Sequence, residues 1–183
     1  MRMDKNAWLI EMAAHVSKRS TCLRRNVGCV LVNARGHVLA TGYNGVAAGL
    51  PNCNEIAVAD RCTRCGAELK ASNMCMSCSH VHLGSDGLTH PNACSGALAP
   101  PDQPQSAAGG CEAIHAEQNA LLQCGDVSAI EACFVTLSPC VTCTKLLMNT
   151  SCARIVFRDA YEPQHDAARD LWARKAGRLW VRA

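Results

Sequence analysis

The sequence predicts an α/β fold, in which a mixed five-stranded sheet lies between layers of helices. Two apolar runs near the start, 27–32 and 37–41, flank a glycine-containing turn and predict a hairpin. After residue 111, apolar runs of strand length alternate with helical segments, which indicates parallel strands with helices on both faces. Between these parts the periodicity is lost, and we expect a single domain over 1–183 with a cysteine-rich insert at 54–110.

The first predicted helix spans residues 4–17, with Asp4 as its N-cap. It is expected to pack on the sheet through a face that includes Ala7, Trp8 and Ile10. The hairpin turn is Asn33-Ala34-Arg35-Gly36, and Gly42-Tyr43-Asn44-Gly45 ends the second strand. The second half is expected to hold helices at 116–124, 140–149 and 166–176, strands at 133–136, 154–157 and 179–181, and a loop at 161–165.

Composition limits the classes of function. At 183 residues and 49% hydrophobic content, the chain is long enough for one domain with a proper core. A net charge of +3 is too small to argue for nucleic-acid binding. No apolar run approaches the roughly 20 residues of a membrane span, and the N-terminus lacks a signal-peptide core. We therefore expect a cytoplasmic protein.

Fourteen cysteines include three C-x-x-C pairs, which chelate metal well and indicate zinc sites in a reducing cytosol. Two of these pairs lie close together in the insert and are spaced as in small zinc knuckles. A structural zinc there would order a segment with too few apolar residues to fold alone. A nucleic-acid-binding knuckle is less favoured, because the insert has no aromatic residues to stack bases. The predicted ligands of this insert zinc are Cys62, Cys65, Cys75 and Cys78.

Further cysteines are scattered around the insert. A second structural zinc that clamps the ends of the insert to the first strand is one hypothesis, and ordinary unliganded thiols are the other. The clamp ligands would be Cys22, Cys53, Cys94 and Cys111, with His80, His82 or His90 as replacements for Cys94. Cys29, Cys124, Cys133 and Cys152 have apolar neighbours and are expected in the core.

His115-Ala116-Glu117 and Pro139-Cys140-Val141-Thr142-Cys143 carry the predicted chemistry. One imidazole and two thiolates leave a tetrahedral zinc with one open position, as in catalytic sites. Ser138 is expected to cap a helix with Pro139 at its first position, so that both cysteines share one face. His115 precedes the other helix, and two helix N-termini should therefore face one metal.

H-x-E followed by P-C-x-x-C is the signature of zinc-dependent nucleobase deaminases. Zinc would lower the pKa of its bound water and make a hydroxide nucleophile. Glu117 would act as the proton shuttle, taking that proton, delivering it to the ring nitrogen and protonating the leaving ammonia. A structural zinc with an incidental glutamate is less favoured, because structural sites usually fill all four positions with Cys or His.

Several short sequence blocks point to one family among the deaminases that carry this signature. They are Ser20-Thr21-Cys22, Thr41-Gly42-Tyr43-Asn44-Gly45, Asn52-Cys53, Ile114-His115-Ala116-Glu117 and Val135-Thr136-Leu137-Ser138-Pro139-Cys140. The chain thereby resembles deoxycytidylate (dCMP) deaminases of phages and of bacterial competence operons. The resemblance implies a cytidine-deaminase-like α/β/α fold and hydrolysis of dCMP to dUMP, which supplies thymidylate synthesis.

The same resemblance implies further cofactors and partners. It implies a homohexamer, dCTP as activator, dTTP as inhibitor, and Mg²⁺ together with the allosteric nucleotide. It also implies a structural zinc held through Cys22 and Cys53. Cys111 is the candidate for the third ligand, and Cys94 or an insert histidine for the fourth. Some phage relatives carry a glutamate ligand two residues before the histidine, but here that position is Ala113.

Residues for the nucleotide follow partly from the resemblance. Asn44 matches an asparagine that contacts the sugar in related deaminases, although a turn asparagine fits the same context. Arg24 and Arg25 suit the 5′-phosphate, whereas Arg169, Arg174, Lys175 and Arg178 are expected on a solvated helix face. The remaining candidates are Ser138 and Tyr161 for substrate, and Gly42, Tyr43 and Gly45 for the allosteric nucleotide.

Three alternatives remain open from the sequence. One is a deaminase of another pyrimidine nucleotide, such as dCTP or a 5-modified dCMP. A tRNA or other polynucleotide deaminase would need a broad basic surface, which a charge of +3 does not supply. An inactive, zinc-stabilised interaction module is disfavoured by the intact Glu117 and the complete ligand trio.

Overall fold

A computed structural model describes residues 2–22, 25–49, 52 and 113–183. Contacts between residues divide the chain into two units. One comprises Met1–Ser20, Asn26–Gly45 and Ile114–Ala183, and the other comprises Thr21–Arg25 and Val46–Ala113. The first unit carries the helices and strands of the described residues. The predicted insert at 54–110 lies outside them, so its boundaries stay a prediction.

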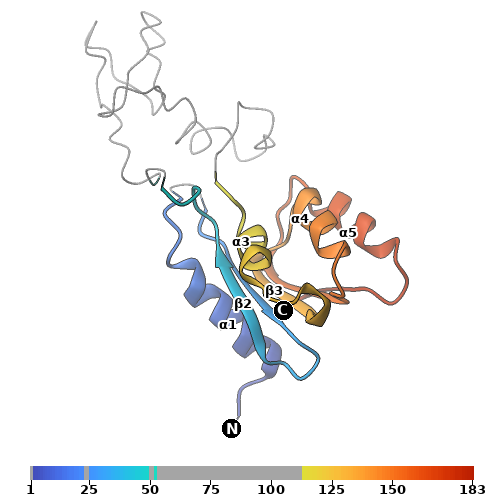
Figure 1. The fold of residues 1–183 in the computed structure, drawn as a ribbon. Helices are drawn as coiled ribbons and strands as arrows, with labels where there is room; N and C mark the ends of the chain where they lie inside the picture. The colour runs from blue at the N-terminus through green and yellow to red at the C-terminus, as the bar shows by residue number, and fades with distance from the viewer. Residues whose placement is uncertain (1, 23–24, 50–51, 53–112) are drawn as a thin grey trace, which may run out of the picture. The chain divides into compact units, whose positions relative to one another are not determined.

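The first unit is built on a five-stranded mixed sheet (Figure 1), as the sequence predicts. The strand order is β2-β1-β3-β4-β5. The first strand along the chain is antiparallel to both of its neighbours, whereas the last three are parallel to one another. The strands are β1 (Gly28–Val32), β2 (Val38–Tyr43), β3 (Ala132–Leu137), β4 (Arg154–Asp159) and β5 (Leu179–Arg182).

Helices cover both faces of this sheet, which confirms the predicted three-layer arrangement (Figure 1). Among the described residues, one helix packs on one face and three helices lie on the other. None of the helices in the described ranges combines the length and apolar character needed to cross a bilayer. The helices are α1 (Lys5–Ser17), α3 (Ala116–Gln123), α4 (Val141–Met148) and α5 (His165–Ala173), with a 3₁₀ turn η1 (Val127–Ala129).

The N-cap of α1 is confirmed, because the Asp4 carboxylate accepts from the backbone N–H groups of Asn6 and Ala7. The predicted packing face is partly wrong. The buried residues are Leu9, Ile10 and Ala13, while Trp8 is 45% exposed. The run from residue 7 to residue 10 is apolar throughout, so periodicity alone does not select which residues face the sheet.

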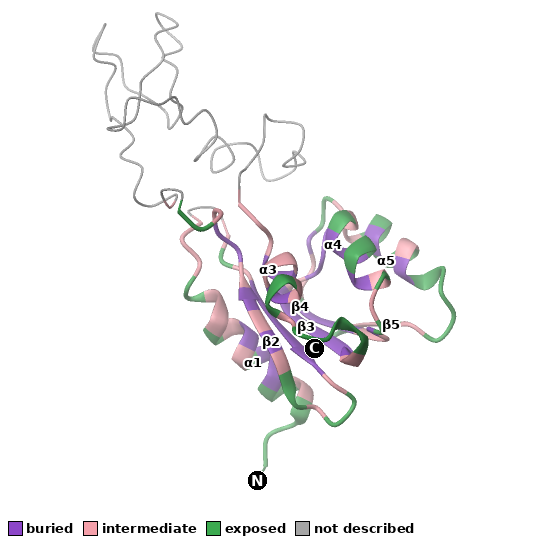
Figure 2. Cartoon of the chain, viewed as in Figure 1, coloured by how far each residue is buried: buried purple, intermediate pink, exposed green. Residues whose placement is uncertain are grey.

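The core has one layer on each face of the sheet, visible as the buried residues of the strands in Figure 2. All five residues of β1 are buried, because both of its faces are covered by helices. The cysteines expected in the core are Cys29, Cys133 and Cys152, which are buried, and Cys124, which is half-buried.

The end of α5 differs from the prediction. The helix stops at Ala173, with Arg174 as C-cap, and Gly177 adopts a positive φ of 79° four residues later. Arg178 then turns back onto the protein instead of joining a solvated face. It donates from Nη2 to the Met148 carbonyl at 2.9 Å, and its guanidinium lies 4.2 Å from the centre of the Trp172 ring.

Close packing of α3 on β2 depends on a glycine. Gly42 lies within β2 rather than after it. A Cβ atom at this position would lie 2.2 Å from the Ala116 carbonyl oxygen and 2.3 Å from the Ala120 nitrogen. Both are backbone atoms of α3 that no side-chain rotation can displace, so only glycine allows this approach.

Gly42→Ala is therefore expected to lower the free energy of unfolding by about 2–3 kcal/mol, because it forces α3 away from the sheet. Urea denaturation followed by circular dichroism measures this change. Gly125→Ala is the control, since a Cβ there meets nothing within 4 Å, and its effect should stay within about 0.5 kcal/mol. Equal stability of the two variants would contradict the packing argument.

Candidate metal centre

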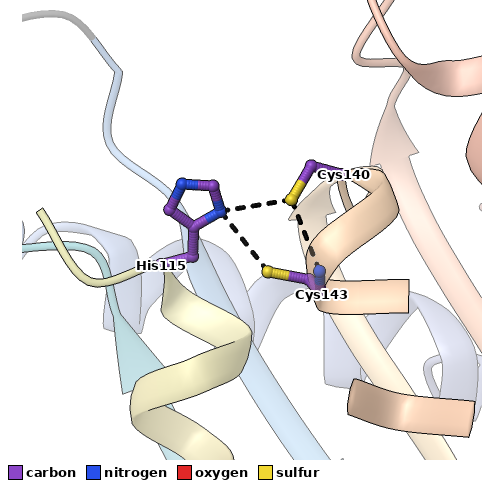
Figure 3. Close-up of side chains that lie close together, drawn as sticks. All are labelled: His115, Cys140 and Cys143. Atoms are coloured by element: carbon purple, nitrogen blue, oxygen red, sulfur yellow. Dashed lines mark hydrogen bonds between the residues drawn. The ribbon is translucent and has the colours of Figure 1, made fainter. Parts of the chain in front are cut away.

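Three ligand-forming side chains meet at the N-termini of α3 and α4 (Figure 3). His115 is the N-cap of α3, Cys140 is the N-cap of α4, and Cys143 lies in the first turn of α4. The Nδ1 atom of His115 is 3.5 Å from Cys140 Sγ and 3.3 Å from Cys143 Sγ. All three ligand atoms lie within 4.8 Å of one another. The structure thus brings together the histidine and both cysteines that the two motifs supply.

These distances fit a tetrahedral zinc ion. With zinc–sulfur bonds of about 2.3 Å and zinc–nitrogen bonds of about 2.05 Å, tetrahedral angles place nitrogen and sulfur about 3.6 Å apart. The observed separations of 3.5 and 3.3 Å need only slight relaxation. Cys140 is 7% exposed and Cys143 is fully buried, so the site is closed on the protein side. The donor set and its geometry therefore suit zinc.

Local hydrogen bonds hold the two helix ends. The backbone N–H of His115 donates to Gln118 Oε1 at 2.9 Å, which fixes the residue before α3. The Asn119 side chain donates to the Tyr43 carbonyl at 2.7 Å and ties the same turn to β2. At the other end, Cys140 Sγ accepts from the Cys143 backbone N–H at 3.4 Å. Each ligand is thereby placed by its own helix start.

The prediction that Ser138 caps α4 is wrong. The chain stays extended through Pro139, and Cys140 itself is the N-cap, with φ −71° and ψ 169°. The reason is that the Cys140 sulfur satisfies an N–H of the first turn and takes the place of a hydroxyl cap. Ser138 is 3% exposed, and its hydroxyl accepts instead from the Tyr161 backbone N–H at 2.8 Å.

Glu117 lies in the first turn of α3 and is only 3% exposed. Burial raises the pKa of its carboxyl group, while the nearby His115 works in the opposite direction. A carboxyl group with a raised pKa beside the ligands is suited to taking up and releasing protons.

The electrostatics favour a thiolate at Cys140. The hydrogen bond from the Cys143 thiol, followed by the interaction with His115, lowers the pKa of Cys140 to about 4. The Cys143 thiol is the donor of this pair, and its pKa is raised by that bond and by burial. The N-terminus of α4 adds a favourable dipole for negative charge. At least one sulfur is thus held in the form that binds metal.

Two candidate nucleotide residues lie at this end of the first unit. Tyr161 is 8% exposed and packs against Cys140 and Cys143. Asn44 is also 8% exposed, and its Oδ1 accepts from the Val27 backbone N–H at 2.8 Å. Asn44 therefore has the turn-stabilising role that its sequence context indicates, whereas Tyr161 lies directly beside the cysteines.

The residues proposed for an allosteric nucleotide have structural contacts as well. Gly42 allows α3 to approach the sheet, and the Tyr43 carbonyl accepts from Asn119. Gly45 pairs with Ile114 through two backbone hydrogen bonds of 3.1 and 2.8 Å, immediately before His115. The packing of α3 and the residues before it therefore explains why glycine occupies positions 42 and 45.

The other predicted site residues belong to the second unit. Cys22 and Arg25 are described and half-buried, and Thr21 next to Cys22 donates to Asn52 Oδ1 at 3.1 Å. The remaining predictions stay open, because they fall outside the described residues: Arg24, Cys53, Cys62, Cys65, Cys75, Cys78, Cys94 and Cys111.

A family model described as the cytidine and deoxycytidylate deaminase zinc-binding region matches residues 3–159. The chain belongs to this deaminase family. The match includes His115, Glu117, Cys140 and Cys143, and its description agrees with a donor set that suits zinc.

Several relatives are named deoxycytidylate deaminase, among them a phage protein and a yeast protein. The protein from Mycobacterium phage D29 is 31% identical over 157 residues, which cover 85% of this chain and 95% of the phage protein. The protein from Schizosaccharomyces pombe is 31% identical over 174 residues, or 94% of this chain. This chain spans only 42% of the yeast protein's length. The family resemblance inferred from the motifs is confirmed.

A solved structure supports the fold of this chain. The crystal structure of dCMP deaminase from cyanophage S-TIM5, in complex with dCMP and dUMP, superposes with a TM-score of 0.61. The alignment covers 100% of this chain and 99% of the phage chain at 22% identity. The predicted cytidine-deaminase-like fold is thereby confirmed.

Sequence reasoning missed the residues that support the Cys140 loop. Gln164 Oε1 accepts from the Val141 backbone N–H at 3.0 Å, and His165 Nδ1 lies 3.0 Å from Ser138 Oγ. Both residues lie more than 20 positions after the cysteines, and no spacing rule links them. The only signal was their place in the predicted loop at 161–165.

Zinc analysis tests this centre. The sequence predicts three zinc ions per chain, and Cys143→Ala is expected to lower the content by one, because two remaining ligands hold zinc poorly. Inductively coupled plasma mass spectrometry of dialysed protein measures the stoichiometry. Cys124→Ala, which alters a half-buried cysteine outside the cluster, should change nothing. An unchanged zinc content in Cys143→Ala would contradict the site, and one zinc in the wild type would contradict both structural sites.

Proposed function

We propose that this chain catalyses the hydrolytic deamination of dCMP to dUMP. The observation that carries the proposal is the convergence of His115, Cys140 and Cys143 at two helix ends, with buried Glu117 beside them. Membership of the cytidine and deoxycytidylate deaminase family supports deamination of a cytosine compound, and relatives named deoxycytidylate deaminase support dCMP among these compounds.

His115 Nδ1 and the two sulfurs would hold the zinc ion and leave its fourth position open. Bound there, zinc supplies Lewis acidity that makes water nucleophilic near neutral pH. The protein contributes the closed side of the site, because Cys143 and Ala116 are fully buried and Glu117 nearly so. This burial keeps bulk water from competing for the proton transfers.

Glu117 is the proton carrier of the proposed reaction. Its carboxylate takes a proton from the water that attacks C4 of the cytosine ring, and passes that proton to N3. It then takes the second proton of the same water and delivers it to the amino group, which leaves as ammonia. N3 keeps the first proton, so dCMP and water give dUMP and ammonia. The raised pKa of Glu117 suits a group that is alternately base and acid.

Further residues are assigned to the base, the sugar and the 5′-phosphate of the nucleotide. Tyr161 is the candidate for the base, since its ring packs against the two cysteine ligands. Asn44 is assigned to the sugar and Arg24 or Arg25 to the 5′-phosphate, because a guanidinium binds phosphate through two parallel hydrogen bonds. Ser138 is a weaker candidate, since its hydroxyl is already engaged within the protein.

The remaining assignments concern cofactors, assembly and metabolism. We propose two structural zinc ions, one in the insert and one clamping its ends, a homohexamer regulated by dCTP and dTTP with Mg²⁺, and a cytoplasmic role in supplying dTMP synthesis. The effector site is assigned to the block around Gly42, Tyr43 and Gly45. The family resemblance supports these assignments.

Glu117→Gln is expected to lower dCMP turnover by about 10²–10⁴-fold, because the amide cannot carry the protons. The zinc content should not change, since Glu117 is not a ligand. Chromatography of dUMP and metal analysis of the same sample measure both effects. Glu131→Gln, which alters a half-buried carboxyl group just before β3, should keep full activity. Retained turnover in Glu117→Gln would exclude Glu117 as the proton carrier.

A substrate panel separates dCMP from its competitors. Purified protein is incubated with dCMP, dCTP, 5-methyl-dCMP, cytidine or a tRNA, each with and without added dCTP where dCTP is not the substrate. We expect dCMP to be converted at least about tenfold faster than the others in kcat/KM, which corresponds to about 1.4 kcal/mol. Preferential conversion of dCTP or 5-methyl-dCMP would replace the proposed substrate. Absence of dCMP turnover under both conditions would refute it.

A further inference from the structure

The loop before α5 and the first residue of that helix, His165, hold the cysteine ligand loop from both sides of Cys140. On the upstream side, Ser138 contacts His165 and the backbone of Tyr161. On the downstream side, Gln164 Oε1 accepts from the Val141 backbone N–H at 3.0 Å. Val141 is the first residue of α4, and its N–H has no partner within the helix. The segment 161–165 thus supplies hydrogen-bond partners that the ligand loop does not find within itself.

The Ser138 hydroxyl is the central group of this contact. Its oxygen accepts from the Tyr161 N–H at 2.8 Å, and the Ser138 backbone N–H donates to the Asp159 carbonyl at 2.8 Å. A hydroxyl has one hydrogen to donate. His165 Nδ1 lies 3.0 Å from the hydroxyl oxygen and accepts this hydrogen in the tautomer that carries the ring proton on Nε2. In that tautomer the hydrogen bond runs from Ser138 to His165.

The His165 ring is itself held in place by the sheet. It stacks edge-on against Phe157 of β4, with ring centres 5.1 Å apart, and against Trp180 of β5 at 5.7 Å. A ring fixed on two strands offers Ser138 an acceptor at a constant position. Ser138 lies only two residues before Cys140. The fixed position of the acceptor therefore also restricts where the Cys140 sulfur lies.

We propose that His165 is a positioning residue for the metal centre, acting through the Ser138 hydroxyl. The inference rests on the zinc site proposed above and deepens it. It differs from a general packing role because it assigns the effect to one hydrogen-bond acceptor, His165 Nδ1, and not to the ring as a whole. Groups that orient metal ligands typically change metal affinity by 10–100-fold when removed.

Two substitutions of His165 separate the acceptor from the ring. His165→Phe keeps an aromatic ring against Phe157 and Trp180 but removes the acceptor. His165→Asn loses the ring, yet its Oδ1 can occupy the position of Nδ1. We expect His165→Phe to weaken Zn²⁺ binding at this site by 10–100-fold, and His165→Asn to bind within about threefold of wild type. Competition with a chromogenic chelator measures the affinity, and the difference from Cys143→Ala isolates this site.

Cobalt gives a readout that does not depend on turnover. In Co²⁺-substituted protein, His165→Phe should shift the visible absorption bands and His165→Asn should restore them, because the bands report the ligand geometry. Ser138→Ala removes the same hydrogen bond from the other side, together with the bond from the Tyr161 N–H, and leaves the ring contacts intact. It should weaken Zn²⁺ binding at least as much as His165→Phe does, and the double variant should bind no more weakly than Ser138→Ala alone. The exposed His37, changed to Phe, is the matched control.

Each result decides between the alternatives. Wild-type affinity and spectrum in His165→Phe, equal loss in His165→Asn and His165→Phe, or additive losses in the double variant would each overturn the positioning role. Wild-type protein without Zn²⁺ at this site would overturn the zinc site and this inference together. Zinc binding without dCMP turnover would refute the substrate alone, since the affinities of the variants can still be compared.

Discussion

The metal centre depends on two helices that begin at the same place. His115 and Cys140 both occupy N-cap positions in an extended backbone conformation, with ψ values of 157° and 169°. A helix N-terminus leaves backbone N–H groups without helical partners and carries partial positive charge. Thiolates and other anions are stabilised there, as the N–H of Cys143 bonding to Cys140 Sγ illustrates. The helix ends thus position the ligands and favour their charged form.

The packing of the helices on the sheet determines how closely the N-termini of α3 and α4 approach each other. The α3 backbone contacts β2 at Gly42, and α1 is equally close to β1 at Gly28, where a Cβ would lie 2.0 Å from the Ala13 carbonyl oxygen. Because both glycines meet backbone atoms, the layer spacing cannot be recovered by side-chain rearrangement. The distance between His115 and the cysteines is therefore a property of the whole first unit.

Glu117 and the thiols share one buried site but have different tasks. The pKa of Glu117 is raised by burial, while that of Cys140 is lowered by its hydrogen bonds and by His115. Environments that move the pKa values of neighbouring groups in opposite directions separate a proton carrier from an anionic ligand. The same separation explains why a glutamate next to three ligands need not become a fourth.

The sequence determined the ligand trio, the neighbouring carboxyl group and the approximate positions of the strands along the chain. H-x-E and P-C-x-x-C are local patterns whose spacing reflects the pitch of a helix start, and the strands are contiguous apolar runs. Tertiary structure decided which face of α1 is buried, because the apolar run at 7–10 has no preferred side. It also decided that Cys140 rather than Ser138 caps α4. Contacts such as His165 to Ser138 join residues 27 positions apart, and only the folded chain brings such residues together.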